Sequence, residues 1–117
     1  MRVFFLRDAT RFPIACVASE KVEDLILYAL SICNPKDKKV FDRRRARTIA
    51  EERMKLVLSS TVREKVTQFS GYVRAEGNIK RALMQELEAD STMPNQVRAA
   101  AEYWLANRPV VEGEYLP

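Results

Sequence analysis

The hydrophobic repeat of this chain changes near residue 42, from a period of two to a period of about 3.6 residues. Before that point, residues 25–33 alternate strictly, with large apolar side chains on one face and a series that tapers to alanine, serine and cysteine on the other. Beyond it, apolar side chains recur at helical spacing. Strands followed by helices predict an α+β domain with an antiparallel sheet.

Three strands are expected in the first part of the chain. The apolar runs 3–6 and 12–18 are separated by a short polar stretch and predict a hairpin. A polar connector at 19–24 then leads to a central third strand at 25–33. Pro13 has no N–H to donate, so the second strand should begin there or lie at an edge. We expect helices on the bulky face of the third strand and a second layer, for which a partner subunit is one candidate, on the smaller face.

About four helices are expected in the rest of the chain. Asp42 is a typical N-cap for the first of them. A capping-box pattern that begins at Thr61 predicts a second helix that ends at Gly77. Apolar spacing predicts a third helix over residues 79–87 and a fourth whose first residue is Pro94.

We expect a single domain over residues 1–109, in which a three-stranded antiparallel meander is followed by about four helices packed on one face. A chain of 117 residues is long enough to bury one hydrophobic core. Residues 110–117 include glycine and proline and are expected to form a loose C-terminal tail. The two edges and the small-residue face of the sheet predict a homo-oligomer.

The N-terminal apolar run, residues 3–6, is too short for the core of a secretion signal and is followed by charged residues. No run approaches the roughly 20 apolar residues of a membrane helix. Cys16 and Cys33 lack the spacing of a metal site and are expected to be buried thiols in a reducing compartment. We therefore expect a cytoplasmic protein with no membrane partner.

The chain contains no histidine, which excludes catalytic sites that pair serine or cysteine with histidine and zinc sites with histidine ligands. Its paired carboxylates lie on helical stretches that predict solvent exposure, and no pattern indicates a nucleophile with its base. We expect a non-enzymatic protein with no catalytic residue, metal or cofactor. An enzyme that works without histidine is the least favoured alternative.

The net charge of +4 is concentrated in residues 41–60, which hold six Lys or Arg against three Asp or Glu. Here a strand end, a polar turn and a helix start place backbone N–H groups beside guanidinium groups, the combination that binds phosphate. The glycines of a P-loop are absent. We predict an anion-binding site in this region. Its expected ligand-binding residues are Asn34, Asp37, Lys39, Arg43, Arg47 and Arg53.

Helix phase separates these arginines. Arg43 and Arg53 lie near the centre of the apolar stripe, whereas Arg44 points outward. An inward guanidinium needs a partner, because burying an unpaired charge is costly. That partner is a carboxylate, a carbonyl or a bound anion, and the sequence leaves these alternatives open. The candidate carboxylates are Asp37 for Arg43 and one from the sheet connector for Arg53.

Aromatic and cationic residues near the end of the chain could contact a nucleobase. Tyr103 and Arg108 are candidate stacking residues at the surface, since proteins bind unpaired bases with aromatic rings and arginines. Trp104 is expected to belong to the core, because amphipathic helices commonly bury this residue type.

A turn with the sequence Asn-Pro-Lys-Asp at 34–37 precedes Phe41-Asp42-Arg43 and the pattern Ala46-Arg47-x-Ile49-Ala50-x-x-Arg53. This succession, within residues 25–55, resembles small uncharacterised proteins of phages and related mobile elements. The resemblance implies such an origin and implies no reaction. The chain departs from the pattern by inserting Lys38 and Lys39 and by having Ala46 in place of the expected glycine.

Two functions are expected from these patterns. The leading one is that of a small phage-type accessory protein, which binds nucleic-acid backbone or a nucleotide phosphate through the basic strand-turn-helix region. The alternative is an inhibitor or adaptor that docks on a host protein, for example a defence protein, through the sheet edge or the C-terminal helices.

Overall fold

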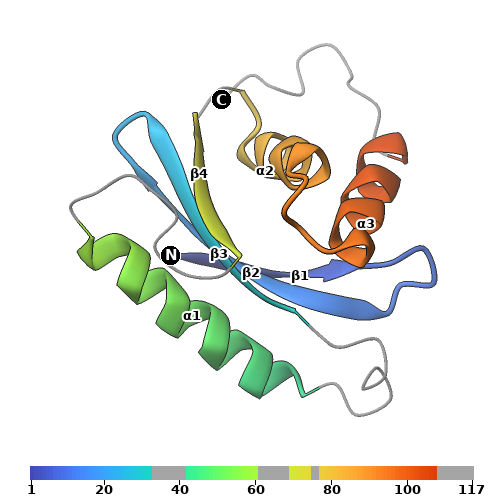
Figure 1. Cartoon of the computed structure of the whole chain (residues 1–117), viewed down its shortest axis with the longest axis horizontal. Helices are drawn as coiled ribbons and strands as arrows, with labels where there is room; N and C mark the ends of the chain where they lie inside the picture. Colours follow the sequence, from blue (N-terminus) through green and yellow to red (C-terminus); the bar gives the residue numbers. More distant parts are fainter. Residues whose placement is uncertain (33–41, 61–68, 75–76, 108–117) are drawn as a thin grey trace.

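The computed structural model describes residues 1–32, 42–60, 69–74 and 77–107, which form one antiparallel sheet flanked by helices (Figure 1). The strands are β1 (Arg2–Arg7), β2 (Pro13–Val22), β3 (Leu25–Ile32) and β4 (Ser70–Arg74). The helices are α1 (Arg43–Ser59), α2 (Ile79–Ala89) and α3 (Asn95–Ala106). The mixed fold with an antiparallel sheet is confirmed, but the described residues form four strands and three helices instead of three and about four.

The strands follow one another in the sheet in the order β1-β2-β3-β4. β2 begins at Pro13, one of the two placements expected for this residue. It continues to Val22, so the predicted polar connector at 19–24 is wrong for most of its length. The outer end of a hairpin tolerates polar side chains because they reach solvent. Only Glu23 and Asp24 separate β2 from β3, and Glu23 has the positive φ, 57°, that such tight turns require.

Residues 70–74 form β4, where the sequence predicted a helix that ends at Gly77. β4 pairs with β3, and Gly71 lies opposite Tyr28. A Cβ atom on residue 71 would lie 2.7 Å from Tyr28 Oη, so a glycine is needed beside this buried ring. Pairing with the open edge of β3 outweighs the helical spacing of a few apolar residues. The capping-box residue Thr61 lies outside the described residues.

The helices cover both faces of the sheet, so the prediction that they pack on one face is wrong (Figure 1). α2 and α3 cover the bulky face, in which Ile26, Tyr28 and Leu30 are buried. α1 covers the small-residue face, and its Ala50 shares a buried cluster with Ala29 of β3. Small side chains on both helix and sheet allow this close approach. The face for which a partner subunit was one candidate is therefore occupied by α1.

The helix ends follow their sequence signals. Asp42 caps α1 as predicted, because its carboxylate accepts hydrogen bonds from the backbone N–H groups of Arg44 and Arg45. α2 and α3 confirm the third and fourth predicted helices, although Pro94 precedes α3 instead of opening it. No helix in the described part of the chain is long and apolar enough to cross a membrane.

Candidate functional site

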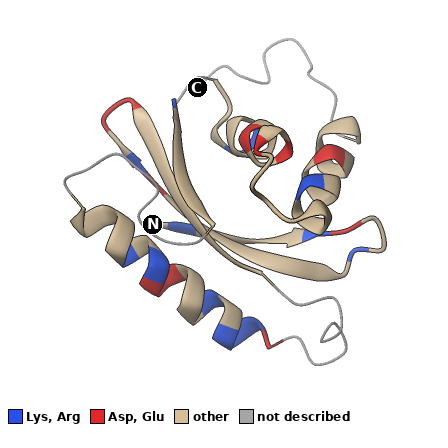
Figure 2. Cartoon of the chain, in the orientation of Figure 1, with Lys and Arg blue, Asp and Glu red and all other residues tan. Residues whose placement is uncertain are grey.

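The first turn of α1 carries three exposed arginines, Arg43, Arg44 and Arg45, and no acidic residue (Figure 2). We call these three residues, together with the exposed Arg47, the α1 arginine surface. The positive end of the helix dipole lies beside these positive side chains, which destabilises a helix by about 0.3–1 kcal/mol for each charge. Asp42, the N-cap, places one negative charge beside these three positive ones. The local electrostatics therefore favour a bound anion.

Arg43 has an inward helix phase, yet its side chain is exposed at the start of α1. Its guanidinium carbon lies 6.0 Å from the centroid of the Phe5 ring on β1, within the range of a cation–π contact. Among the residues that the structure describes, no carboxylate forms an ion pair with Arg43. Asp37 lies outside these residues, so the Arg43–Asp37 pair stays a prediction.

Arg53 is half-buried and has an internal partner. Its Nη1 atom donates to the carbonyl oxygen of Leu30 at 2.6 Å, and its guanidinium carbon lies 6.0 Å from the centroid of the Phe69 ring. The acceptor is a backbone carbonyl, one of the partners that the sequence left open, and not the carboxylate of the sheet connector. Leu30 is also the residue whose N–H donates to Phe69 beside the first residue of β4. Arg53 thus ties α1 to the sheet, and its other N–H groups are those that could reach a ligand.

Arg47 is exposed, and its Nε atom donates to Glu51 Oε1 at 2.8 Å, one turn further along α1. So exposed an ion pair contributes little stability and can be exchanged for a phosphate contact. Both charges act on Cys16 in the sheet. Burial raises the pKa of the Cys16 thiol to about 11, an effect that Arg47 opposes and Glu51 reinforces. Cys16 is therefore a buried, unreactive thiol, while Cys33 lies outside the described residues.

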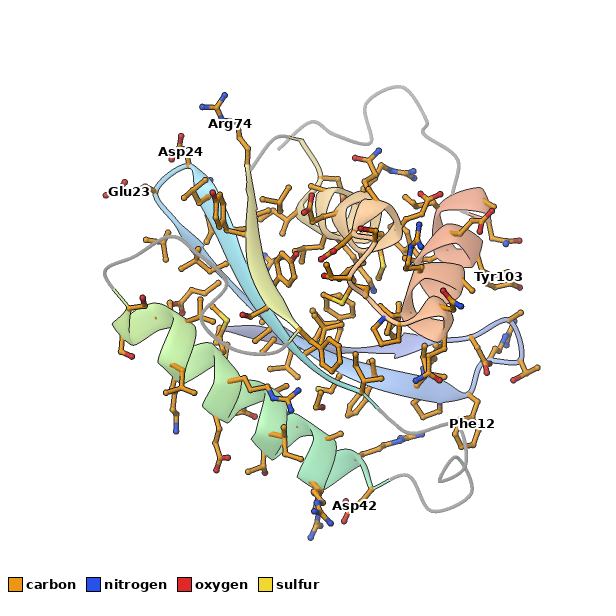
Figure 3. All side chains as sticks on the ribbon, in the orientation of Figure 1. Phe12, Glu23, Asp24, Asp42, Arg74 and Tyr103 are labelled. Atoms are coloured by element: carbon orange, nitrogen blue, oxygen red, sulfur yellow. The ribbon has the colours of Figure 1, made fainter. Side chains whose placement is uncertain are left out.

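The other predicted contact residues are distributed as follows. Asn34, Asp37, Lys39 and Arg108 lie outside the described residues, as does the predicted tail at 110–117. Tyr103 is 44% exposed on α3, and Trp104 packs half-buried against the core, as expected. Figure 3 shows Tyr103 and the α1 cap residue Asp42 on opposite sides of the sheet. The structure therefore does not add Tyr103 to the α1 arginine surface.

A second basic surface escaped the sequence analysis. A hollow of about 540 Å³ lies where the β1–β2 turn faces α2 and α3, and we call it the turn pocket. Its wall includes the cations Arg7, Arg11 and Lys80 and the aromatic residues Tyr103 and Trp104. These residues are far apart in the sequence and no charge run marks them. The one available signal is that Arg7 and Arg11 flank the polar turn.

No group of three or more His, Cys, Asp or Glu residues that could hold a metal ion occurs in the described ranges. Comparison of the chain with protein-family models, curated proteins and solved structures finds no match. The resemblance to phage proteins therefore stays a prediction, and function is inferred from geometry and charge.

Proposed function

We propose that the protein binds the phosphate groups of a nucleic acid or nucleotide through the α1 arginine surface and catalyses no reaction. The observation that carries the proposal is the reversed charge of the first turn of α1, where arginines lie beside the positive end of the helix. A bound polyanion would relieve this repulsion, which the free protein retains. Guanidinium groups also suit phosphate, because two parallel N–H groups can bind two oxygens.

Neighbouring residues would extend the contact. Asn34, Asp37 and Lys39 precede α1 in the sequence and belong to the proposed site. Arg53 would act mainly by holding α1 on the sheet through Leu30, with its remaining N–H groups available to a phosphate. The resemblance described above favours a small accessory protein of phage or mobile-element origin.

Phosphate contacts predict binding that depends on salt more than on base sequence. If three arginines each replace a counterion on duplex DNA, log K should fall with log salt concentration with a slope of about −3. Fluorescence polarisation with single-stranded and double-stranded oligonucleotides measures this slope, and a panel of labelled nucleotides tests whether a single phosphate group suffices. Absence of salt-dependent binding to every probe would contradict the proposal.

The double variant Arg44→Glu/Arg45→Glu separates a binding role from a structural one. Acidic residues suit the first turn of a helix, so the variant should unfold at a higher temperature than the native protein. Its affinity for the oligonucleotides should nevertheless fall by about tenfold or more, because two phosphate contacts are lost. Lys55→Glu, an exposed change further along α1, is the matched control and should reduce affinity much less. Equal losses in both proteins would indicate a general charge effect.

Protein docking at the edge of β4 is a second candidate. β4 is the last strand of the sheet among the described residues, and Tyr72 on it is 45% exposed. An open edge can pair with an added strand of another protein. Tyr72→Arg should then abolish capture of a host protein from a nuclease-treated lysate, while Arg44→Glu/Arg45→Glu should not. Equal capture of the host protein by the native protein and by Tyr72→Arg would exclude the edge of β4 as the docking site.

A further inference from the structure

The turn pocket combines positive charge with an aromatic wall. Its volume of about 540 Å³ lies within the range of about 300–1,000 Å³ that is common for small-molecule sites. Arg7 and Arg11 come from the β1–β2 hairpin, at the end of β1 and in the turn, Lys80 comes from α2, and Tyr103 and Trp104 come from α3. Three separate elements thus converge on one hollow.

The β1–β2 turn, which follows Arg7 and carries Arg11, is held in a defined shape. Asp8 Oδ1 accepts hydrogen bonds from Thr10 N at 2.9 Å, Thr10 Oγ1 at 2.6 Å and Phe12 N at 3.0 Å. The backbone adds bonds between Asp8 and Phe12 and between Asp8 and Arg11. Asp8 is the one carboxylate in the described wall of the pocket, and these bonds direct its Oδ1 atom into the turn itself.

Arg11 occupies an unusual backbone position. Its φ of 67° lies in the left-handed region, which glycine and asparagine adopt more readily than arginine. Arg7 Nη1 donates to the Arg11 carbonyl oxygen at 3.0 Å, so the two residues are linked. An arginine at a position that disfavours it, beside a second arginine and an open hollow, is a signal of function.

The aromatic wall is accessible. Tyr103 is 44% exposed, and Trp104 is half-buried beside it. The Lys80 ammonium lies 5.7 Å from the centroid of the Trp104 ring and 4.7 Å from that of Phe4. A positive charge over a ring face is attracted to it, which orders Lys80 at the border of the pocket.

We propose that the turn pocket binds one nucleotide, with its phosphate at Arg7 and Arg11 and its base against Tyr103 and Trp104. Guanidinium groups supply paired donors for phosphate oxygens, and aromatic rings bind the face of any base. Inorganic phosphate would leave the rings unused, and an uncharged aromatic ligand would leave the cations unused. A nucleotide is the ligand class that uses both.

The nucleotide can be free or part of a single strand. Phe5 of β1 lines the turn pocket and also lies beneath Arg43, so this strand stands between the pocket and the α1 arginine surface on the other side of the sheet. A single strand of nucleic acid that passes around the sheet edge at β1 could place its backbone on α1 and one unstacked base in the pocket. Occupancy by a strand rests on the function proposed above, whereas occupancy by a free nucleotide is independent of it.

Trp104 is the only tryptophan of the chain, so its fluorescence reports on this pocket. The full-length protein is titrated with adenosine monophosphate and uridine monophosphate, with ribose 5-phosphate and inorganic phosphate as controls without a base, and with a short single-stranded oligonucleotide. We expect the nucleotides and the oligonucleotide to quench Trp104, and the two controls to bind at least tenfold more weakly because they have no base to stack.

Three variants identify the contacts. Arg11→Asn preserves the left-handed backbone, and Arg7→Gln keeps a side-chain donor for the Arg11 carbonyl; each should weaken nucleotide binding by about tenfold. Tyr103→Leu should lower the affinity for the nucleotides and leave the affinity for inorganic phosphate unchanged. Absence of nucleotide quenching, or an unchanged affinity in Arg11→Asn with a native circular dichroism spectrum, overturns the proposal.

Arg44→Glu/Arg45→Glu distinguishes the two ligand sources. Loss of oligonucleotide affinity with intact nucleotide binding supports occupancy by a strand that also contacts α1. Unchanged affinity for both ligands contradicts the function proposed for the α1 arginine surface but supports a turn pocket that acts by itself.

Discussion

The two faces of the sheet meet their helices through side chains of different size. The buried residues between the sheet and α1 include Cys16, Ala18, Ala29, Ala46 and Ala50. Those of the sheet beneath α2 and α3 include Leu6, Ile14, Val17, Ile26, Tyr28 and Leu30. On the first face the small side chains let α1 approach the sheet closely. On the second face large side chains fill a wider space between the sheet and its helices.

The two basic surfaces also differ in how they relate to the packing of the face on which each lies. α1 lies close to the sheet and presents its arginines on its first turn, outside the packed layer. The wider layer under α2 and α3 instead ends in a hollow, because Tyr103 and Trp104 border the space near the β1–β2 turn without filling it. The following changes test the contrast, in order of expected effect.

The largest effect is expected from truncation on the bulky face. Ile26→Ala removes a completely buried side chain and leaves a cavity, so the free energy of unfolding should fall by about 2–5 kcal/mol. Urea denaturation measures the loss, with Lys21→Ala at an exposed position of β2 as control. A loss below about 1 kcal/mol would show that this face collapses around the gap and is not filled by rigid packing.

The next largest effect is expected in the pH dependence of stability, because Cys16 is buried on the face under α1. In the folded protein the pKa of Cys16 is raised from 9.0 to about 11, so between these values the folded state keeps a proton that the unfolded state releases. The stability that depends on the protonated Cys16 thiol is therefore fully present below pH 9. As pH rises towards 11, about 2–3 kcal/mol of the free energy of unfolding is lost. The check compares unfolding of native protein and Cys16→Ala across this range. Identical pH slopes would argue against a desolvated thiol.

Enlarging a small residue should destabilise only the face under α1. Ala50→Leu inserts a larger side chain where helix and sheet are in close contact, and the free energy of unfolding should fall by about 1–3 kcal/mol. Ala89→Leu, at an exposed position near the end of α2, should change it by no more than about 0.5 kcal/mol. If both variants unfold alike, close packing under α1 is not what positions this helix.

The smallest effect is expected at the β3–β4 pair. Gly71→Ala places a methyl group against Tyr28 and should lower the free energy of unfolding by about 1 kcal/mol. In a Tyr28→Phe background the cost should be smaller, because the hydroxyl oxygen that lies 2.7 Å from the new Cβ is absent. A double-mutant cycle measures this coupling. A coupling of zero would mean that the ring moves aside freely.

The fold was predictable where a pattern repeats along one element. The alternation in β3, the strand start at Pro13 and the cap at Asp42 were read correctly from residues that are neighbours in the sequence. β4 was missed because a five-residue strand carries too short a pattern to outweigh helical spacing. The side on which α1 packs depends on matched alanine volumes across two elements, which periodicity does not encode.

The candidate sites, like the fold, could be predicted where they depend on residues that are neighbours in the sequence. The α1 arginines form a local charge run, so the sequence indicated this region and named Arg43 and Arg47, but it did not name Arg44 and Arg45 as contact residues. Helix phase also showed that Arg53 needs a partner, although the Leu30 carbonyl could be identified only from the packed structure. The turn pocket depends on Arg7, Lys80 and Tyr103 being brought together from three elements, and their sequence separation hides it.

The position of β4 in the sheet has a consequence for the order of folding. β1, β2 and β3 are joined by short turns, whereas α1 and its flanking segments intervene between β3 and β4. Closing this longer loop costs roughly 2 kcal/mol more chain entropy than closing a tight turn. β4 is also the shortest strand in the described part of the sheet. Hydrogen exchange should therefore show the β4 amides opening before those of β2, transiently uncovering the backbone edge of β3.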